Sequence, residues 1–566
     1  MNAPTSALVA PRPERLRLVG QRRQILTMMH QRLMFGLLVY AGVVALIVVR
    51  ILYLAAFGDH AGAKRGLTAL VPERGDIIDR DGQPLARTID AWTIGLWPKK
   101  VIGDKLELAR SLARLMPERD EAAYFAMLKS GKSFYYLRRR AAPGVVEAVN
   151  ALGEPGIALE REPDRLYPQT SLAAHVIGFT TIDGRGVAGM ERAFDKQLSD
   201  PATRGEPLQL SISARIQQAM EHELLTAMTK FSAKGAAGVI MDIHTGEVLA
   251  LTSLPQLNPN AAGQGSPEAR FNRATLGVFE LGSTFKPFTV AMAMDSGIIK
   301  SFGKMYNCPH DFPAYGKVIH DTHPYGRACS VAEIMKESSN IGSAQIAAQV
   351  GATRQRAFLD KMGFLKRSEV ELLEKGRPIL PRDWGPLDVM TIGYGHSLAV
   401  SPLHLASGYA TLFNGGIYRP PTLLKVGKGH ATGKGHRVFT EETSYKMRSL
   451  LRLVVTEGTG KKADAPGYRV GGKTGSAEKY ENRTKLVTSF AGVFPMDEPR
   501  YVMVMMLDEP NATAETYGFR TAAWNVGPAF GAAVSRIAPM LGVRPDKNRE
   551  PDMSLVLPYV HEDAKH

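Results

Sequence analysis

With 566 residues the chain is too long for a single hydrophobic core, and its length predicts two to four domains. Its composition, 44% hydrophobic and 22% charged, is ordinary for a globular protein. The formal net charge of +15 would suit an anionic partner, but no basic tract interleaved with aromatic residues and no nucleic-acid motif is present, so we expect no nucleic-acid binding.

The first part of the chain predicts a membrane anchor. Leu33 to Val49 is free of charge, and after Arg50 the apolar stretch resumes from Ile51 to Phe57, which is enough length to cross a bilayer as one helix. Arg50 can extend toward a headgroup. No small-residue cleavage pattern follows, so we predict an uncleaved signal anchor rather than a removed signal peptide, and this length and position disfavour a core helix.

The charge before the anchor predicts its orientation. Within the first 32 residues only Glu14 opposes six arginines, which gives +5 of the total: Arg12, Arg15, Arg17, Arg22, Arg23 and Arg32. Positive charge stays on the cytoplasmic side of membrane helices. The tail is therefore predicted to be cytoplasmic, and everything after about residue 58 is predicted to lie outside.

The segment between the anchor and residue 232 has mixed patterns. Glu73 to Gly82 reads as a strand closed by an Asp-Gly turn. Helical spacing covers Leu106 to Met116 and Glu121 to Leu128, and Ile212 to Lys230 predicts an amphipathic linking helix. The charged run Arg138 to Arg140 is interpreted as a solvated face.

The remaining chain predicts one antiparallel sheet with helices on its faces. Gly238 to Asp242 and Glu247 to Leu251 read as a hairpin, a largely helical middle follows to about residue 415, and a closing helix spans roughly Ala522 to Met540. Three further strand patterns complete a five-stranded sheet: Tyr468 to Gly475, Val487 to Phe494 and Tyr501 to Leu507. The tail from about Pro545 is predicted to be mobile.

A hydroxyl and an amine lie one helical turn apart at Ser283 and Lys286. Pro287 fits the opening turn of a helix, so a helix beginning near Ser283 is expected, with an apolar body and Gly297 as its C-cap. A Ser-x-x-Lys match alone is weak, because a capped helix with a solvated lysine is the commoner explanation. Two further motifs strengthen it.

Ser338-Ser339-Asn340 and Lys473-Thr474-Gly475 follow in chain order and complete the three-part signature of penicillin-binding proteins and serine beta-lactamases. Ser330 with Glu333 is a capping box, which starts a short helix that ends at the first of these motifs, and Ile341 to Val350 predicts the next helix. A polar loop between two helix ends can project its side chains into a cleft.

These residues predict acyl transfer through a covalent intermediate. Ser283 would attack a peptide carbonyl, and Lys286 would take the proton, with its pKa lowered by burial and by Lys473. Ser338 would relay that proton to the departing amine. Asn340 would orient Lys286 and bind the substrate amide.

The third motif is predicted to hold the substrate. Lys473 and Gly475 face one side of a strand, and Thr474 and Ser476 face the other. The two hydroxyls would hold a terminal carboxylate, and Gly475 lets a ligand backbone lie close to the strand. The backbone NH groups of Ser283 and Ser476 would form the oxyanion hole.

Two cysteines, Cys308 and Cys329, would face an oxidising compartment, where spacing alone leaves a disulfide undecided. The segment between them also contains His310, Asp311, His320, Asp321 and His323. No standard zinc spacing fits this cluster, so we predict no metal and no cofactor.

Several motifs resemble class B penicillin-binding proteins. Beside the three catalytic motifs, the likeness rests on Tyr394-Gly395-His396 and Ser401 to His404, and on pedestal motifs at Glu73 to Gly82, Arg165 to Pro168 with His175 and Gly178, and Gly189 to Glu191. Gly472 to Lys479 looks closest to the division-specific septal members. His404 departs from the glutamine of many relatives, which puts nothing catalytic in doubt. Arg74 and Glu191 are expected to be structural or signalling residues.

This resemblance implies a multidomain α+β protein with five parts: a basic tail (1–32), an anchor (33–57), an elongated pedestal (58–232), a penicillin-binding transpeptidase domain (233–544) and a flexible tail (545–566). It implies cross-linking of peptidoglycan stem peptides on lipid-linked nascent glycan at the septum. It also implies inhibition by beta-lactams, and an FtsW-type glycosyltransferase and other division proteins of the inner membrane as partners.

Three rival readings stay open. A beta-lactamase would need a deacylating glutamate, and the nearest candidates, Glu369, Glu371 and Glu374, look like an exposed helix. A membrane-anchored beta-lactam sensor or scaffold would bind without turnover. An elongation-type transpeptidase would share the same site.

Overall fold

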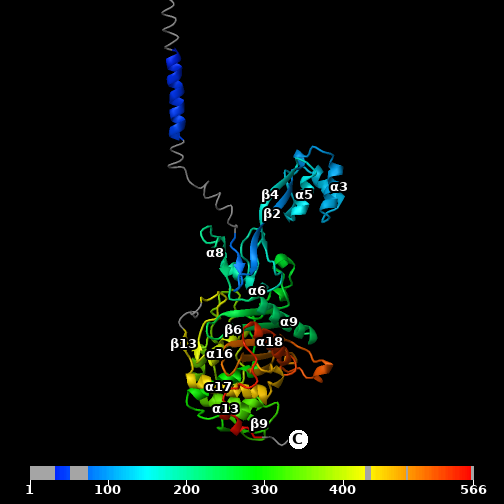
Figure 1. Ribbon diagram of the computed structural model, residues 1–566. Coiled ribbons are helices and arrows are strands. Elements are labelled where there is room, and N and C mark those ends of the chain that lie inside the picture. The colour runs from blue at the N-terminus through cyan, green and yellow to red at the C-terminus, as the bar shows by residue number, and fades with distance from the viewer. Residues whose placement is uncertain (1–31, 51–73, 428–434, 480–481, 562–566) are drawn as a thin grey trace, which may run out of the picture. The chain divides into compact units, whose positions relative to one another are not determined.

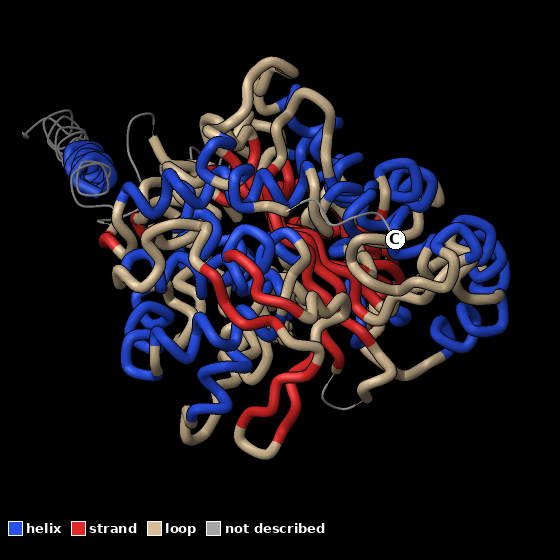
Figure 2. Tube along the Cα trace, turned by 90° about the horizontal axis from the view of Figure 1, so that it is seen from below, coloured by secondary structure: helices blue, strands red, loops and turns tan. Residues whose placement is uncertain are grey.

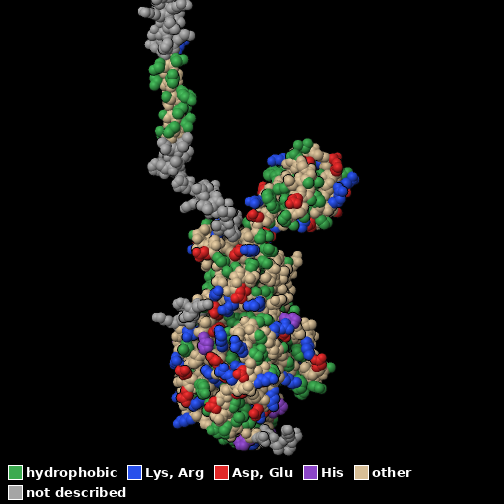
Figure 3. Space-filling model, viewed as in Figure 1, with side chains coloured by type: hydrophobic (Ala, Val, Ile, Leu, Met, Phe, Trp, Pro, Cys, Tyr) green, Lys and Arg blue, Asp and Glu red, His purple; other side chains and the backbone are tan. Residues whose placement is uncertain are grey.

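The structure is a computed structural model that describes residues 32–50, 74–427, 435–479 and 482–561 (Figure 1). The chain divides into two compact units, Met1–Val71 and Pro72–His566. In the first unit the helix Arg32–Arg50 is long and apolar enough to cross a membrane, and its side chains are exposed. Figure 3 shows apolar side chains along this helix. The predicted basic tail up to residue 31 and the rest of the predicted span, 51–57, lie outside the described residues.

The second unit begins with a sheet built on the long strand β2 (Pro84–Leu96), which pairs along its length with β4 (Ile157–Leu166) (Figure 1). Three helices, α3 (Lys105–Leu115), α4 (Glu121–Lys129) and α5 (Pro143–Asn150), pack beside the Leu96 end of β2 around a small hydrophobic core of their own. The helices predicted at Leu106 to Met116 and Glu121 to Leu128 correspond to the first two of them. The remaining elements here are β1 (Ile77–Ile78), η1 (Pro98–Lys100), β3 (Tyr135–Ala141), α6 (Ala174–Ile177), α7 (Gly189–Ala193), α8 (Asp195–Ser199) and β5 (Leu208–Gln209).

The arginine run in β3 is paired rather than solvated, so that prediction was wrong. Arg138 contacts Glu118 at 3.0 Å, Arg140 contacts Asp164 at 2.9 Å, and Arg139 pairs with Glu162. The three side chains are only 26–35% exposed. Each meets a carboxylate from a neighbouring element, and sequence spacing alone does not show such partners.

A buried ion cluster joins the base of this region. The Glu191 carboxylate is fully buried and accepts from Arg74 Nε at 2.6 Å and from Arg165 Nε at 2.7 Å. Arg74 also contacts Asp195 at 2.8 Å. The two arginines are themselves only 6% and 3% exposed, so the three segments hold one another through charges that water does not reach.

The C-terminal region contains the predicted five-stranded antiparallel sheet, in the order β14-β15-β16-β6-β7. Its strands carry apolar residues on both faces because helices cover both faces. Figure 2 shows these strands enclosed by helices. The strands are β6 (Gly235–Asp242), β7 (Val248–Leu254), β14 (Gly471–Glu478), β15 (Leu486–Phe494) and β16 (Tyr501–Asp508).

Helices α9 (Ala214–Lys230) and α18 (Val526–Met540) cover one face of this sheet. The linking helix predicted from the sequence is therefore real, but it packs on the C-terminal sheet through Ile216, Met220 and Leu224. The domain boundary predicted at residue 232 stays a prediction.

The other face is covered by a helical layer that carries the candidate site. Its main helices are α11 (Lys286–Asp295), α12 (Val331–Lys336), α13 (Asn340–Val350), α14 (Ala352–Lys361), α15 (Pro386–Ile392), α16 (Pro402–Phe413) and α17 (Glu441–Thr456). Shorter elements are η2 (Pro259–Gln264), α10 (Pro267–Arg270), η3 (Gly282–Phe285), β8 (Met305–Cys308), β9 (Asp311–Ala314), β10 (Lys317–His320), β11 (Arg327–Ser330), β12 (Ile417–Tyr418), β13 (His436–Arg437), η4 (Lys461–Ala463), η5 (Ala514–Thr516), η6 (Met553–Leu555) and η7 (Leu557–Tyr559).

The segment after Pro545 packs against the domain, so the prediction of a mobile tail is wrong for residues 545–561. Arg452, whose side chain is 7% exposed, pairs with Glu550 at 2.7 Å, and Val556 is fully buried. The Ser330 hydroxyl donates to the Tyr559 carbonyl at 2.7 Å. The buried Arg452 and the core cluster that receives Val556 are tertiary features, and the polar composition of the tail does not reveal them.

Candidate active site

Ser283 lies in η3, directly before α11. The predicted α-helix thus begins three residues later, at Lys286, with Pro287 in its opening turn as expected. From Leu281 to Ala293, Ser283 is the one residue whose side chain keeps partial exposure. Gly282 has φ +56°, and a Cβ there would lie 2.8 Å from the Ser476 carbonyl oxygen, so only glycine permits this approach to β14.

Lys286 connects the first motif to the second. Its side chain is fully buried, and Nζ donates to Ser338 Oγ at 3.0 Å and to Asn340 Oδ1 at 2.8 Å. Nζ also donates to the Ser338 carbonyl. Ser338 has φ +65°, a left-handed conformation that a serine adopts only when its surroundings impose it. The predicted capping box at Ser330 and the predicted helix after the motif are both present.

Strand β14 brings the third motif to the first. A Cβ at Gly475 would lie 2.2 Å from the Leu281 carbonyl oxygen, so this strand runs directly against the turn that carries Ser283. Lys473 is fully buried, and its Nζ lies 3.3 Å from Thr474 Oγ1 and 3.4 Å from Thr459 Oγ1. The three predicted motifs therefore meet in one place.

Burial sets the protonation of both lysines. Desolvation lowers the pKa of Lys286 well below its usual value, and the positive charge of Lys473 lowers it further, whereas Asp321 opposes the shift. Burial lowers the pKa of Lys473 to about 7, opposed by Glu337. A neutral Lys286 can accept a proton, which a solvated lysine at neutral pH cannot.

The two hydroxyls of the third motif have protein partners. Ser476 Oγ accepts from the Ala522 backbone NH at 3.0 Å, and Thr474 Oγ1 lies 3.1 Å from Thr459 Oγ1. Sequence reasoning treated both hydroxyls as open to substrate. The Ser476 hydroxyl still has its own proton to donate, and its acceptor bond fixes its direction.

Three supporting groups of the site carry no recognisable motif in the sequence. Asp321 accepts from Ser339 Oγ at 2.6 Å and from the Ile341 NH at 3.0 Å, at the beginning of α13. Thr459 lies beside Lys473. Glu280 accepts from the Ser397 NH at 2.8 Å, and the pKa of neighbouring His396 falls to about 4 through burial and the charge of Lys286. These contacts join segments far apart in sequence, so no spacing pattern marks them.

The cysteine segment holds a disulfide between Cys308 and Cys329, with Cα atoms 6.0 Å apart. Among the described residues, no group of three or more histidine, cysteine or acidic side chains is arranged to hold a metal ion. Between the two cysteines, His320 pairs with Asp311 at 2.7 Å, and Asp321 contacts α13.

The predicted exposed helix around Glu369 to Glu374 is wrong, because this stretch is not helical. Glu371 accepts from the Leu423 backbone NH at 2.9 Å and from the Thr422 hydroxyl. The carboxylate therefore anchors the loop that follows α16. This structural role accounts for the acidic residue, and no role in activating a water for deacylation is needed to explain it.

Comparison with known proteins agrees with this architecture. The penicillin binding protein transpeptidase domain matches residues 236–526, and the penicillin-binding protein dimerisation domain matches residues 69–202. The chain therefore belongs to the class B penicillin-binding proteins.

Its relatives include the "Probable peptidoglycan D,D-transpeptidase FtsI" of Caulobacter vibrioides, 38% identical over 86% of this chain and 84% of that protein. The "Peptidoglycan D,D-transpeptidase FtsI" of Escherichia coli is 30% identical over 84% of each chain. Penicillin-binding protein 3 of Mycobacterium tuberculosis, solved with aztreonam, shares the fold, with a TM-score of 0.66 at 24% identity over 84% of this chain and 97% of that one.

Proposed function

We propose that this protein is a serine-type peptidoglycan D,D-transpeptidase. The observation that carries the proposal is the buried Lys286 amine, bonded to Ser338 Oγ and Asn340 Oδ1 within one turn of the accessible Ser283. The relatives named above as D,D-transpeptidases support it.

The proposed reaction has two acyl transfers. Ser283 Oγ forms a bond to the carbonyl carbon of the penultimate D-alanine of a stem peptide, while neutral Lys286 takes the hydroxyl proton. The C–N bond to the terminal D-alanine breaks, and Ser338 passes a proton to the departing amine. The amine of a second stem peptide then attacks the acyl-serine ester, releases Ser283 with its proton restored, and leaves a cross-link.

Charge stabilisation would come from the backbone. The NH groups of Ser283 and Ser476 would bind the oxyanion, and one such donor is typically worth ~3 kcal/mol. Thr474 and Ser476 would bind the substrate carboxylate beside Lys473, and Gly475 would let the peptide backbone approach. A beta-lactam would acylate the same oxygen. Its amine stays tethered to the acyl group, so the second step has no free site for an incoming amine.

The setting of the reaction is proposed from the anchor and the relatives. The helix Arg32–Arg50 would hold the protein in the bacterial inner membrane, with the basic N-terminus in the cytoplasm and the catalytic domain in the periplasm. The FtsI relatives support a septal role beside an FtsW-type glycosyltransferase and other division proteins, acting on lipid-linked nascent glycan. Midcell localisation of an N-terminal fluorescent fusion would support this role, whereas sidewall localisation would favour an elongation transpeptidase.

The activity is tested by mapping the acylated residue. Full-length protein in detergent is incubated with benzylpenicillin, digested and analysed by mass spectrometry, and we expect one adduct on the peptide that contains Ser283. Ser283→Ala should abolish it, whereas Ser296→Ala, at the other end of α11, should retain it. Labelling that survives in Ser283→Ala would refute the assignment. Growth supported by Ser283→Ala as the only copy would favour a scaffold.

The pH dependence of acylation is a second expectation. Lys286 must be neutral and Lys473 charged, so the rate should rise with pH on the acid side and fall as pH passes about 7, the pKa of Lys473. Stopped-flow measurements with a fluorescent penicillin between pH 4 and 10 check this. Lys473→Arg stays charged over that range and should lose the alkaline limb. The same limb in both proteins would contradict the assignment.

A further inference from the structure

The second catalytic motif lies against an arm of residues 305–330, formed by β8 to β11. Strands β8 and β11 pair antiparallel and are linked by the buried Cys308–Cys329 disulfide. The hairpin β9–β10 extends from them and packs on α13 through Ala314, Ile319 and Ile341. We call residues 305–330 the disulfide arm.

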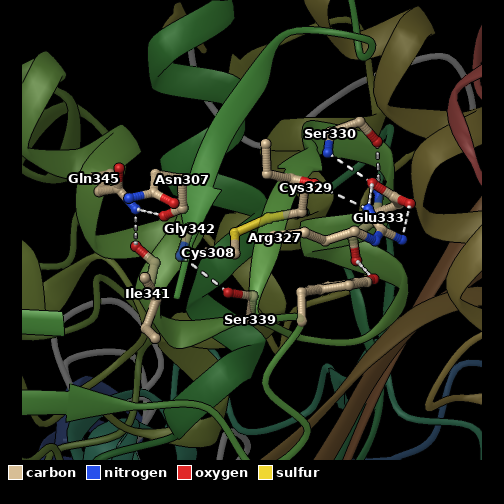
Figure 4. The surroundings of a disulfide bond; sticks show 12 residues. Asn307, Cys308, Arg327, Cys329, Ser330, Glu333, Ser339, Ile341, Gly342 and Gln345 are labelled. Carbon is tan, nitrogen blue, oxygen red and sulfur yellow. Dashed lines mark hydrogen bonds and ion pairs between the residues drawn. A yellow bond between two sulfur atoms is a disulfide. The ribbon is translucent and has the colours of Figure 1, made fainter. Parts of the chain in front are cut away.

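The disulfide lies between the two helix ends that flank the motif. Figure 4 shows it between the N-cap and first turn of α13, Ser339 and Gly342, and the capping box of α12, Ser330 and Glu333. Strand β8 is also tied to α13, because Gln345 Nε2 donates to the Asn307 carbonyl. The covalent link thus closes the arm at the point where it meets both helices.

The base of the hairpin, where β10 ends, supplies the contacts to the motif itself. The His320 carbonyl accepts from Asn340 Nδ2 at 2.9 Å. The Asp321 carboxylate accepts from Ser339 Oγ at 2.6 Å and from the backbone NH groups of Asn340 and Ile341. Asn340 Oδ1 in turn accepts a hydrogen bond from Lys286 Nζ. Asp321 therefore acts on the proposed proton acceptor, Lys286, through one intermediate residue, Asn340.

We propose that Asp321, held by the disulfide arm, is a positioning residue that fixes the Ser338–Asn340 loop against Lys286. It also supplies a negative charge to the site. This inference rests on the proposed function and identifies a residue outside the three catalytic motifs on which acylation depends.

The positioning role of Asp321 can be measured because its charge also affects the pKa of Lys286. Lys473 on β14 and His396 after α15 face it, with Asp321 as the acidic group from the arm. Asp321 raises the pKa of Lys286 against the larger effects of burial and Lys473. Removing the negative charge should therefore lower that pKa further and move the acid limb of the acylation profile to lower pH.

The test uses full-length protein in detergent and a fluorescent penicillin. Asp321→Asn should move the acid limb to lower pH. Its plateau rate should also fall by roughly ten- to a hundred-fold, because the Ser338–Asn340 loop would no longer be held in position against Lys286. Asp321→Glu keeps the charge, so its limb should stay in place while its plateau falls. Labelling stoichiometry gives the active fraction of each variant, and rates are compared per active molecule.

The matched control is Asp311→Asn on the same hairpin, whose exposed carboxylate pairs with the His320 ring; we expect its profile to match wild type. The inference is overturned if the limb of Asp321→Asn does not move, even when its plateau or melting temperature falls, because a merely structural role would give that result. Failure of the proposed function is distinguishable, since wild-type protein would then not acylate at Ser283.

The disulfide is tested by the double variant Cys308→Ala/Cys329→Ala. With the arm no longer closed covalently, the plateau rate per active molecule should fall several-fold while Asp321 remains in the chain. A rate within about two-fold of wild type would overturn the part of the proposal that assigns the disulfide to the arm.

Discussion

Lys286→Ala is expected to lower the rate of penicillin acylation at Ser283 by about 10³-fold or more. The variant removes the proposed proton acceptor, and general base catalysis alone typically contributes ~10²- to 10⁴-fold. It also leaves Ser338 Oγ and Asn340 Oδ1 without the amine that both contact in a fully buried position. The measurement is the second-order acylation rate constant from stopped-flow fluorescence at pH 7.

Two variants sharpen this result. Lys286→Arg keeps a long cationic side chain, but a guanidinium does not release its proton at these pH values, so we expect no rescue. Lys300→Ala, at an exposed lysine shortly after α11, should acylate at the wild-type rate. If Lys286→Arg were as fast as wild type, Lys286 would act only through its charge, and the proton-accepting role would be wrong.

Glu191→Ala is expected to destabilise the region around β4 and α7 by about 3–5 kcal/mol, because it leaves two buried arginines without their shared carboxylate. Asp195 would still contact Arg74, but its side chain is 40% exposed, and the ion pair of Arg165 is with Glu191 itself. Hydrogen–deuterium exchange read by mass spectrometry measures the effect locally, which avoids assuming that a chain with several domains unfolds in one step.

The expected exchange rates follow from that energy. A loss of ~3 kcal/mol corresponds to roughly a hundred-fold faster exchange of the protected amides, at 1.4 kcal/mol per factor of ten. Glu121→Ala is the matched control, because its ion pair with Arg110 is about half exposed on both sides and should change exchange by less than ten-fold. Equal effects of the two substitutions would show that burial of the Glu191 cluster contributes nothing.

Local patterns predicted the elements that hold the site. The capping box at Ser330, the proline in the first turn of α11 and the glycine-rich strand at Lys473 are decided by residues close together in sequence. Alternation predicted five strands, although β14 begins at Gly471 rather than Tyr468. Ser283 itself lies in a 3-10 turn, because the positive φ of Gly282 and the nearby strand redirect the chain there.

What sequence reasoning missed depends on partners brought together by folding. Asp321 contacts α13 from the position directly after β10, and nothing in its sequence neighbours marks it as different from Asp311, whose exposed carboxylate pairs with His320. The polar tail looked mobile because the buried guanidinium of Arg452, which Glu550 contacts, is almost a hundred residues away in the chain. Glu371 was misread for the same reason, since the groups that donate to its carboxylate, the Thr422 hydroxyl and the Leu423 backbone NH, lie about fifty residues further along the chain.

The docked tail has a practical consequence for cell biology. His561 Nδ1 lies 3.0 Å from Glu333, in the same capping box that Tyr559 contacts, and this box begins the helix leading to Ser338. A fluorescent protein fused after the C-terminus would disturb the contacts that His561 and Tyr559 make at the beginning of that helix. Imaging with such a fusion would report on an altered enzyme, so the label belongs at the opposite end of the polypeptide, before the helix Arg32–Arg50.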